Sequence, residues 1–427
     1  MFNSFFLQGN FRILLIALCL FFQTPALASD WSSYWASMWQ KKAEQGDKEA
    51  QYNLGLMYYE GEGVIRDYEI ASEWFEKAAN QGHVTAQFNL GLMAYEGKGL
   101  EQNYQKAIEW FEKAANQGDI SAQCNLGVIY AEGQGVEQNY KTAAEWYEKA
   151  AELGSLEAQW NLGVMYYKGQ GVSQNYTTAA KWFEKAAHLG NTQAQIMLAF
   201  MYYEGQGFTQ DYKQASEWFE KAAQQGNVLA QYNLGLIYYE GLGVVQDQKI
   251  AMDWFEKAAH QGDMQAQYNL GLIYYEGQGI SRDYTKALHW FEKAASQGDV
   301  RAQSTLGFMH YKGQGAEHDD KKAVYWFEKA ANQGDVEAQY NLGLMFYEGK
   351  GLKQDYKKAF QWFEKAAKQG EPDAQSILGF MYYKGQGVSQ NYSKACKWYE
   401  KAANQGDMRA QYMHRLLQKK IKTENVP

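Results

Sequence analysis

The amino-acid sequence predicts an all-α solenoid, a stack of helix pairs, and three observations support this fold class. An Ala-Gln pair begins at Ala50 and recurs at every 36th residue up to Ala410, without an insertion. A fixed period of roughly 20 to 50 residues is typical of repeat arrays, in which each repeat packs only against its neighbours. Apolar residues keep helical spacing throughout, and only three prolines interrupt the 427 residues. Ten complete repeats therefore occupy residues 50–409.

Each repeat is predicted to contain two helices. In the first copy, Ala50, Leu54, Met57 and Tyr58 share one helical face because they lie at i, i+4, i+7 and i+8. The Gly-x-Gly element that begins at Gly61 then ends this first helix.

The second helix of the first repeat is predicted to begin at Tyr68 and to end at Gly82. Glu73 and Lys77 are spaced for an ion pair on its outer side. The apolar face consists of Tyr68, Ala71, Trp74, Phe75, Ala78 and Ala79. In every repeat the preceding residue has a side-chain oxygen that can cap the free N–H groups of the first turn. These predicted caps are Asp67, Asn103, Asn139, Asn175, Asp211, Asp247, Asp283, Asp319, Asp355 and Asn391.

The chain ends are predicted to be capping helices, over residues 29–49 and 410–427. Before them, Arg12 is followed by an apolar run from Ile13 to Phe22 and by the small-residue pattern that ends at Ala28. This pattern is typical of a secretory signal over residues 1–28, cleaved after Ala28. The run is short for a membrane span. We therefore expect a periplasmic or secreted protein with no transmembrane segment in the mature chain.

Composition narrows the possible partners. Hydrophobic residues make up 46% of the chain and aromatic residues 16%, which indicates a folded protein. The net charge of −8, with both signs interspersed, argues against a nucleic-acid surface. After cleavage only Cys124 and Cys396 remain, more than seven repeats apart, so we expect two free thiols.

The repeated pattern resembles a known family. The unit A-Q-x-N-L-G-x-M-Y-Y-E-G-x-G, followed by N/D-Y-x-x-A and W-F-E-K-A-A-x-Q-G, is similar to the Sel-1-like repeat, a relative of the tetratricopeptide repeat. This resemblance implies antiparallel helix pairs in a right-handed superhelix whose first helices line the concave side. It also implies an adaptor that assembles other proteins, in several bacterial members at the contact with host cells. Some exported members carry a cysteine pair in each repeat, which this chain lacks.

The predicted binding groove lies on the first helix of each repeat, opposite its buried stripe. In the first repeat it contains Tyr52, Leu56, Tyr59 and Glu60, with Asn53 at the edge. Amphipathic rings are good contact residues because they bury area at little entropy cost. The Tyr59 position is tyrosine in nine repeats: Tyr59, Tyr95, Tyr167, Tyr203, Tyr239, Tyr275, Tyr311, Tyr347 and Tyr383. The alternative role, of equal weight, is a structural contact with the next repeat.

The Asn53 position carries the other predicted contact residues. Seven repeats have asparagine there: Asn53, Asn89, Asn125, Asn161, Asn233, Asn269 and Asn341. The other three repeats have Met197, Thr305 or Ile377, and in each of them the residue three positions later is phenylalanine: Phe200, Phe308 or Phe380. Because side chains at i and i+3 meet on a helix, the phenyl group is predicted to exclude the amide. The amide suits an extended peptide backbone, or alternatively a neighbouring helix.

No set of residues predicts catalysis, a metal or a cofactor. The seven histidines lack the spacing of a zinc hydrolase, and the Gly-x-Gly element follows a helix, where it acts as a helix stop. Lys168, Lys312 and Lys384 replace the glutamate of the Glu60 position, which excludes a shared acid–base role. Some family members are linked to β-lactam binding, so a periplasmic cell-wall ligand or hydrolase is the alternative function, although no nucleophile with a neighbouring base can be named.

The sequence thus predicts a monomeric, exported scaffold that is not an enzyme. Its partner is expected to be a protein or an extended peptide on the concave side.

Overall fold

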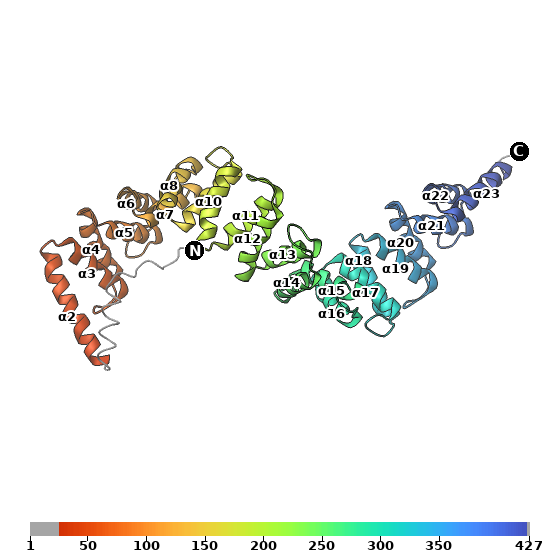
Figure 1. Cartoon of the computed structure of the whole chain (residues 1–427), viewed down its shortest axis with the longest axis horizontal. Coiled ribbons are helices and arrows are strands. Elements are labelled where there is room, and N and C mark those ends of the chain that lie inside the picture. The colour runs from red at the N-terminus through yellow and green to blue at the C-terminus, as the bar shows by residue number, and fades with distance from the viewer. Residues whose placement is uncertain (1–24, 425–427) are drawn as a thin grey trace. The chain divides into compact units, whose positions relative to one another are not determined.

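The computed structural model describes residues 25–424, and all regular secondary structure in that range is α-helical. These residues form twenty-two helices, labelled α2 to α23 in Figure 1. The predicted signal segment lies outside the described residues, except for its last four, which begin α2. No helix in the described range is long and apolar enough to cross a membrane.

The helices alternate in two series. Helices A, the first of each repeat, are α3 (Lys48–Glu60), α5 (Val84–Glu96), α7 (Ile120–Glu132), α9 (Leu156–Lys168), α11 (Thr192–Glu204), α13 (Val228–Glu240), α15 (Met264–Glu276), α17 (Val300–Lys312), α19 (Val336–Glu348), α21 (Pro372–Lys384) and α23 (Met408–Glu424). Helices B are α2 (Pro25–Glu44), α4 (Tyr68–Asn80), α6 (Tyr104–Asn116), α8 (Tyr140–Glu152), α10 (Tyr176–His188), α12 (Tyr212–Gln224), α14 (Gln248–His260), α16 (Tyr284–Ser296), α18 (Asp320–Asn332), α20 (Tyr356–Lys368) and α22 (Tyr392–Asn404).

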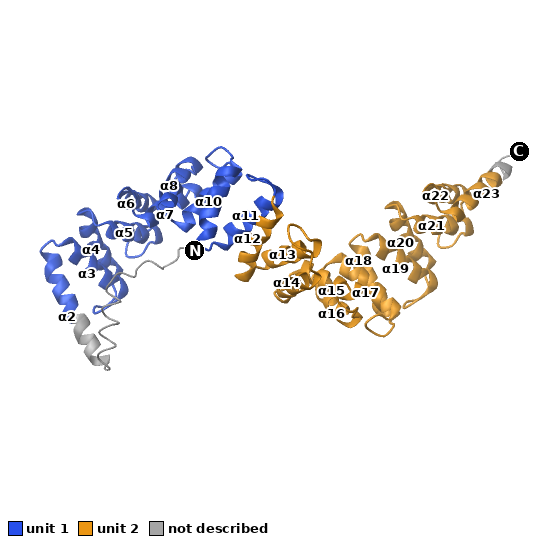
Figure 2. Cartoon of the chain, in the orientation of Figure 1, with its two compact units in different colours: residues 1–210 blue, residues 211–427 orange. Residues whose placement is uncertain are grey.

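The chain divides into two compact units, which Figure 2 shows in different colours. The first comprises residues 1–210, with α2 to α11, and the second residues 211–427, with α12 to α23. Within each unit, every helix A packs against the helix B before it and, where one follows in the same unit, against the helix B after it. The predicted all-α stack of helix pairs is confirmed.

Local signals place the helix ends where the sequence predicts them. The Asp67 carboxylate accepts hydrogen bonds from the N–H groups of Glu69 and Ile70, and all ten predicted caps act in this way. Gly61 ends α3 with a φ of 77°, a left-handed conformation that favours glycine. A second set of caps, which the sequence analysis did not identify, begins the helices A. In the first repeat it is Asp47, which accepts from the Ala50 N–H.

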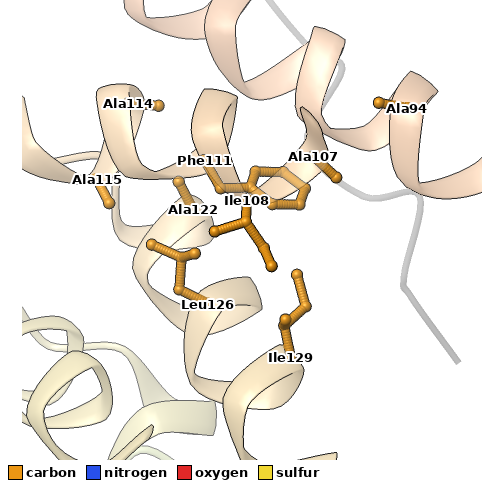
Figure 3. Close-up of a cluster of buried hydrophobic side chains, with 9 residues drawn as sticks. All are labelled: Ala94, Ala107, Ile108, Phe111, Ala114, Ala115, Ala122, Leu126 and Ile129. Carbon is orange, nitrogen blue, oxygen red and sulfur yellow. The ribbon is translucent and has the colours of Figure 1, made fainter. Parts of the chain in front are cut away.

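The core of each repeat is built from alanines, one large aromatic ring of helix B, and a leucine and a methionine or isoleucine of helix A. Figure 3 shows Ile108 and Phe111 of α6 beside Leu126 and Ile129 of α7. Phe111 is 1% exposed, and the buried alanines around it allow the helix backbones to approach closely. This large ring, a phenylalanine in eight repeats and a tyrosine at Tyr147 and Tyr399, packs with the predicted alanine stripe in the core of each repeat.

Close approach also explains two repeated glycines. A Cβ added to Gly91, inside α5, would lie 2.5 Å from the Phe111 ring. A Cβ added to Gly99, the second glycine of the Gly-x-Gly element, would lie 2.2 Å from the backbone oxygen of Tyr68 in the preceding repeat. The second glycine thus serves the contact between repeats, in addition to the predicted end of the helix.

A glutamine relay joins successive repeats. In the first repeat, the buried Gln51 donates through Nε2 to the Ala43 carbonyl at the end of α2. Its Oε1 accepts from Nε2 of Gln81, in the turn after α4, at 2.7 Å, and Gln81 also donates to the Gly46 carbonyl. The Gln81 position is called here the turn glutamine. The same bond to the buried glutamine recurs at Gln117, Gln261, Gln297, Gln333, Gln369 and Gln405.

The relay is broken at two consecutive turns of the first compact unit. Leucine replaces the turn glutamine at Leu153 and Leu189, which are 54% and 56% exposed. The glutamines that would receive those bonds, Gln123 and Gln159, keep their Nε2 bonds but have a buried Oε1 without a hydrogen-bond partner. The contacts between repeats at these two turns therefore have fewer hydrogen bonds than those at the turns with glutamine.

The predicted ion pair on helices B is wrong. Lys77 lies over the ring of Trp74, 3.8 Å from its centroid, and it is not paired with Glu73. A lysine lies over the tryptophan three residues before it in all ten repeats. Even at an exposed site, a cation–π contact is worth roughly 0.5 to 1 kcal/mol, more than the roughly 0.3 to 0.5 kcal/mol of an i,i+4 ion pair, which explains the preference.

Candidate partner-binding face

The predicted contact residues all lie on helices A. We call the surface formed by the positions of Tyr52, Asn53, Leu56, Tyr59 and Glu60 in successive repeats the helix-A face. The predicted tyrosines and asparagines of this face are half-buried, except Asn89, which is buried.

Tyrosines at the Tyr52 position pack against the core phenylalanine of their own repeat. The ring centroids of Tyr52 and Phe75 lie 5.8 Å apart, and those of Tyr268 and Phe291 lie 5.6 Å apart. Burial raises the pKa of both tyrosines above its usual value. These phenols therefore remain protonated at neutral pH and cover the core with one ring face.

Tyrosines at the Tyr59 position, the phenol row, link one repeat to the next. Within its own repeat, the Tyr59 ring makes an edge contact with Tyr68, at 5.1 Å between centroids. Farther along, the Tyr167 hydroxyl donates to Oε1 of Gln206 at 2.8 Å, across the repeat boundary. Equivalent bonds join Tyr95 to Gln134, Tyr239 to Gln278, Tyr275 to Gln314 and Tyr347 to Gln386. The structural role that the sequence left open thus accounts for the hydroxyl groups.

Two members of the phenol row have other partners. The Tyr311 hydroxyl accepts a hydrogen bond from the Lys350 ammonium at 2.9 Å. The Tyr383 ring contacts Tyr392, at 5.7 Å between centroids.

The asparagines do not share one environment. The Nδ2 groups of Asn233 and Asn341 donate to the carbonyl oxygens of Leu229 and Glu337, one turn earlier in their own helices, at 2.7 and 2.9 Å. Asn89 instead bonds the phenol of Tyr52 in the preceding repeat. Asn269 likewise bonds the phenol of Tyr232. Asn53 and Asn161 are half-buried on the same face.

Two of the three repeats that pair phenylalanine with a missing asparagine also have serine at a third position. In the repeats of Phe308 and Phe380, the Tyr52 position is also changed, to Ser304 and Ser376. The Ser304 hydroxyl donates to Asp335, the cap at the start of α19, and Phe308 packs against the core cluster of Phe327. In this repeat the aromatic ring that covers the core has therefore moved by one helical turn, from position 304 to position 308.

Thiol chemistry at the two free cysteines is restrained by their surroundings. Cys124 is buried, with its Sγ 3.1 Å from the Ser155 Oγ, and burial raises the pKa of this thiol to about 11. The thiolate, which is the nucleophile, is therefore scarce at neutral pH.

Cys396 lies beside His414, but the hydrogen bonds of this histidine place its proton on Nδ1, the nitrogen that faces the thiol. A base that accepts the thiol proton would need a free lone pair on that nitrogen. The Cys396 Sγ is 3.4 Å from the His414 Nδ1, which is also 3.0 Å from the Cys396 carbonyl oxygen. The Gln418 amide nitrogen donates to Nε2 at 2.8 Å, so Nε2 is the acceptor and Nδ1 carries the proton toward that carbonyl. No lone pair on Nδ1 is then available to accept the thiol proton, and burial raises the pKa of Cys396.

Comparison with known proteins identifies the repeat. A sequence model of the family described as the Sel1 repeat matches ten consecutive segments between residues 48 and 407. The chain is 41% identical to the crystal structure of a protective antigen present in uropathogenic Escherichia coli strains that displays an SLR fold, covering 90% of this chain and 82% of that chain with a TM-score of 0.73. It is 34% identical to a Sel1 repeat protein from Oxalobacter formigenes, covering 73% of this chain and 90% of that chain with a TM-score of 0.57. No curated protein matches the chain by sequence.

The matched segments are residues 48–83, 84–119, 120–155, 156–191, 192–227, 228–263, 265–299, 300–335, 336–371 and 372–407. Each contains one helix A and one helix B of the structure. The chain therefore belongs to the Sel1 repeat family, whose helix-pair scaffold is typical of protein–protein interaction.

Proposed function

We propose that the mature protein is an exported scaffold that binds another protein, or an extended peptide, along the helix-A face at the contact between a bacterium and its host. The family scaffold supports protein binding. The Escherichia coli structure that resembles this chain is described as a protective antigen, which supports a place where the protein meets the host.

The observation that carries the proposal is the oriented amide on helices A. Because Nδ2 of Asn233 and of Asn341 is bonded to the carbonyl one turn earlier, the oxygen of each amide is directed away from that carbonyl. It can accept a hydrogen bond from the backbone N–H of a partner. A half-buried leucine follows three residues later in both repeats, Leu236 and Leu344. An acceptor beside an apolar side chain, present in two repeats of the same unit, suits an extended polypeptide better than a small ligand.

The phenol row is also part of this proposal, but its hydroxyl groups have a structural role. Its hydroxyls hold neighbouring repeats together, while its half-buried rings form part of the helix-A face. Replacing these tyrosines by alanine would disturb the stack as well as the surface. The asparagines are therefore the better residues for a binding test.

The test uses a random-peptide library displayed on phage and panned against the chain from Ser29 onward. Peptides that bind should lose affinity for the triple variant Asn233→Ala, Asn269→Ala and Asn341→Ala, by about tenfold if each amide contributes roughly 0.5 kcal/mol. The matched control replaces three exposed amides at the ends of helices B, at Gln224, Asn332 and Asn404, by alanine. Equal binding to the two triple variants, both with unchanged circular dichroism, would exclude the helix-A face as the binding surface.

A further inference from the structure

Charge changes along the helix-A face of the second compact unit. The last residues of α13, α15, α17, α19 and α21 are Glu240, Glu276, Lys312, Glu348 and Lys384. The two lysines occur in the repeats of Phe308 and Phe380, in which asparagine is also lost. These two repeats therefore exchange an amide for a phenyl ring and a carboxylate for an ammonium group.

Both ammonium groups lie near aromatic rings. The Lys312 Nζ is 5.5 Å from the ring centroid of Phe308 and 5.5 Å from that of Tyr311. The Lys384 Nζ is 5.4 Å from the Tyr383 centroid. Among the described residues, neither ammonium group has a carboxylate oxygen within 4.0 Å. Both lysines are exposed, so their charge is available to a partner.

The intervening repeat adds a third cation. Lys350 donates to the Tyr311 hydroxyl at 2.9 Å and pairs with Glu348 at 2.8 Å. These four side chains, three lysines and one glutamate, sum to a charge of +2, in a chain whose net charge is −8. Phe380 is 36% exposed, so an apolar ring accompanies the charge at the surface.

We propose that this basic-aromatic surface, formed by Phe308, Tyr311, Lys312, Lys350, Phe380 and Lys384, binds an acidic polypeptide segment that also carries apolar side chains. The inference rests on the proposed function and names the chemistry of its partner. Carboxylates of the partner neutralise Lys312 and Lys384, which have no carboxylate of their own, and its apolar side chains cover the two phenyl rings.

A single-stranded nucleic acid fits this surface less well, although lysines and aromatic rings are also its usual contacts. Its backbone carries one phosphate per nucleotide, and Glu348 lies in the repeat between Lys312 and Lys384. A polypeptide can place its carboxylates opposite the lysines and a neutral residue opposite the glutamate. The net negative charge of the whole chain adds repulsion against a polyanion.

The test measures fluorescence anisotropy of a labelled peptide of about 15 residues, in which Asp and Glu alternate with Leu and Tyr and which spans up to about 50 Å when extended. An isosteric peptide with Asn and Gln in place of the acids is the second probe, and oligouridylate of similar length is the third. The double variant Lys312→Glu and Lys384→Glu should bind the acidic peptide at least tenfold more weakly. The matched control, Lys329→Glu and Lys401→Glu, makes the same charge change on helices B of the same two repeats, where each lysine lies over a tryptophan ring.

The proposal is supported if the acidic peptide binds, its affinity falls with added salt, and only the helix-A double variant loses it. It is overturned if the isosteric peptide binds equally well, if the control variant loses as much affinity, or if oligouridylate binds more tightly through the same lysines. Absence of binding to the acidic peptide also overturns it. In that case, the proposed function still holds if panned peptides depend on Asn233, Asn269 and Asn341. If the acidic peptide does not bind and the panned peptides do not depend on these asparagines, the proposed function is also overturned.

Discussion

Restoring the turn glutamine at Leu153 should strengthen the array locally. In the intact turns the glutamine donates to a buried Oε1 and to a glycine carbonyl, as Gln261 does to Gln231 and Gly226. The Leu153→Gln variant places the same donor next to the Gln123 Oε1, which has no hydrogen-bond partner, and next to the Gly118 carbonyl. Both acceptors lie at the spacing found in the other repeats.

The size of the effect follows from opposing contributions. Satisfying a buried acceptor relieves about 1 to 3 kcal/mol, and the second hydrogen bond adds about 0.5 to 1.5 kcal/mol. Leu153 is 54% exposed, so its loss removes only about half of the 1.5 to 3 kcal/mol that full burial of a leucine provides. Ordering the longer glutamine side chain costs about 1 kcal/mol more. The net expectation is a stabilisation of about 1 kcal/mol.

Hydrogen exchange read by mass spectrometry is the appropriate assay, because a repeat array opens locally and its global unfolding is not two-state. A gain of about 1 kcal/mol slows exchange in α7 to α9 by about fivefold. Leu153→Ala removes the leucine without supplying a donor and serves as the control. The reverse change, Gln261→Leu, should speed exchange near α13 to α15 by a similar factor. Unchanged or faster exchange in Leu153→Gln, with Gln261→Leu also silent, would refute the relay as a stabilising element.

Three further outcomes are expected. In a urea titration, Gly99→Ala should destabilise the chain by about 2 kcal/mol more than Gly118→Ala. Both glycines have a positive φ, but only a Cβ at Gly99 would meet a backbone oxygen. Equal losses of stability would show that backbone conformation alone matters. Burial lowers the pKa of His310, so the folded state binds a proton less readily than the unfolded state, and stability should fall as the pH drops below about 6.5. In thermal melts, His310→Phe should reduce the loss of stability between pH 7.5 and pH 5. An unchanged pH dependence would contradict the role given to His310. Chain recovered after export should begin at Ser29 by N-terminal mass spectrometry, and an uncleaved Met1 would contradict the signal prediction.

The sequence predicted the helices and their ends because the groups that set them lie within a few residues of one another. The oxygen of Asp67 reaches the N–H groups of Glu69 and Ile70, and Gly61 needs only its own backbone to adopt a left-handed conformation. The buried stripe of α3 could also be predicted, since helical spacing places Ala50, Leu54 and Met57 on one side. Strict recurrence then extended each of these local conclusions to ten repeats.

The candidate site could be placed on helices A from the sequence, but the roles of its residues could not. A tyrosine that recurs every 36 residues has the same pattern whether it contacts a partner or the next repeat. The observed contact of Tyr167 with Gln206 spans 39 residues, so it depends on how one repeat docks on another. The sequence also did not show that Phe308 takes over the role of the aromatic residue missing at Ser304. Positions 304 and 308 lie on adjacent turns of one helix, and Phe308 packs against the core cluster of Phe327.

What the sequence by itself determined is thus the repeat, its helices, its caps and the family to which the chain belongs. Tertiary structure alone decided which side chains join repeats: the turn glutamine to a buried glutamine 30 residues earlier, and the second glycine of the Gly-x-Gly element to the backbone of the preceding repeat. The physical reason is the sequence separation of the interacting groups. Caps and helical faces depend on residues within one or two turns of each other, whereas packing between repeats depends on distances between backbones that the sequence period does not specify.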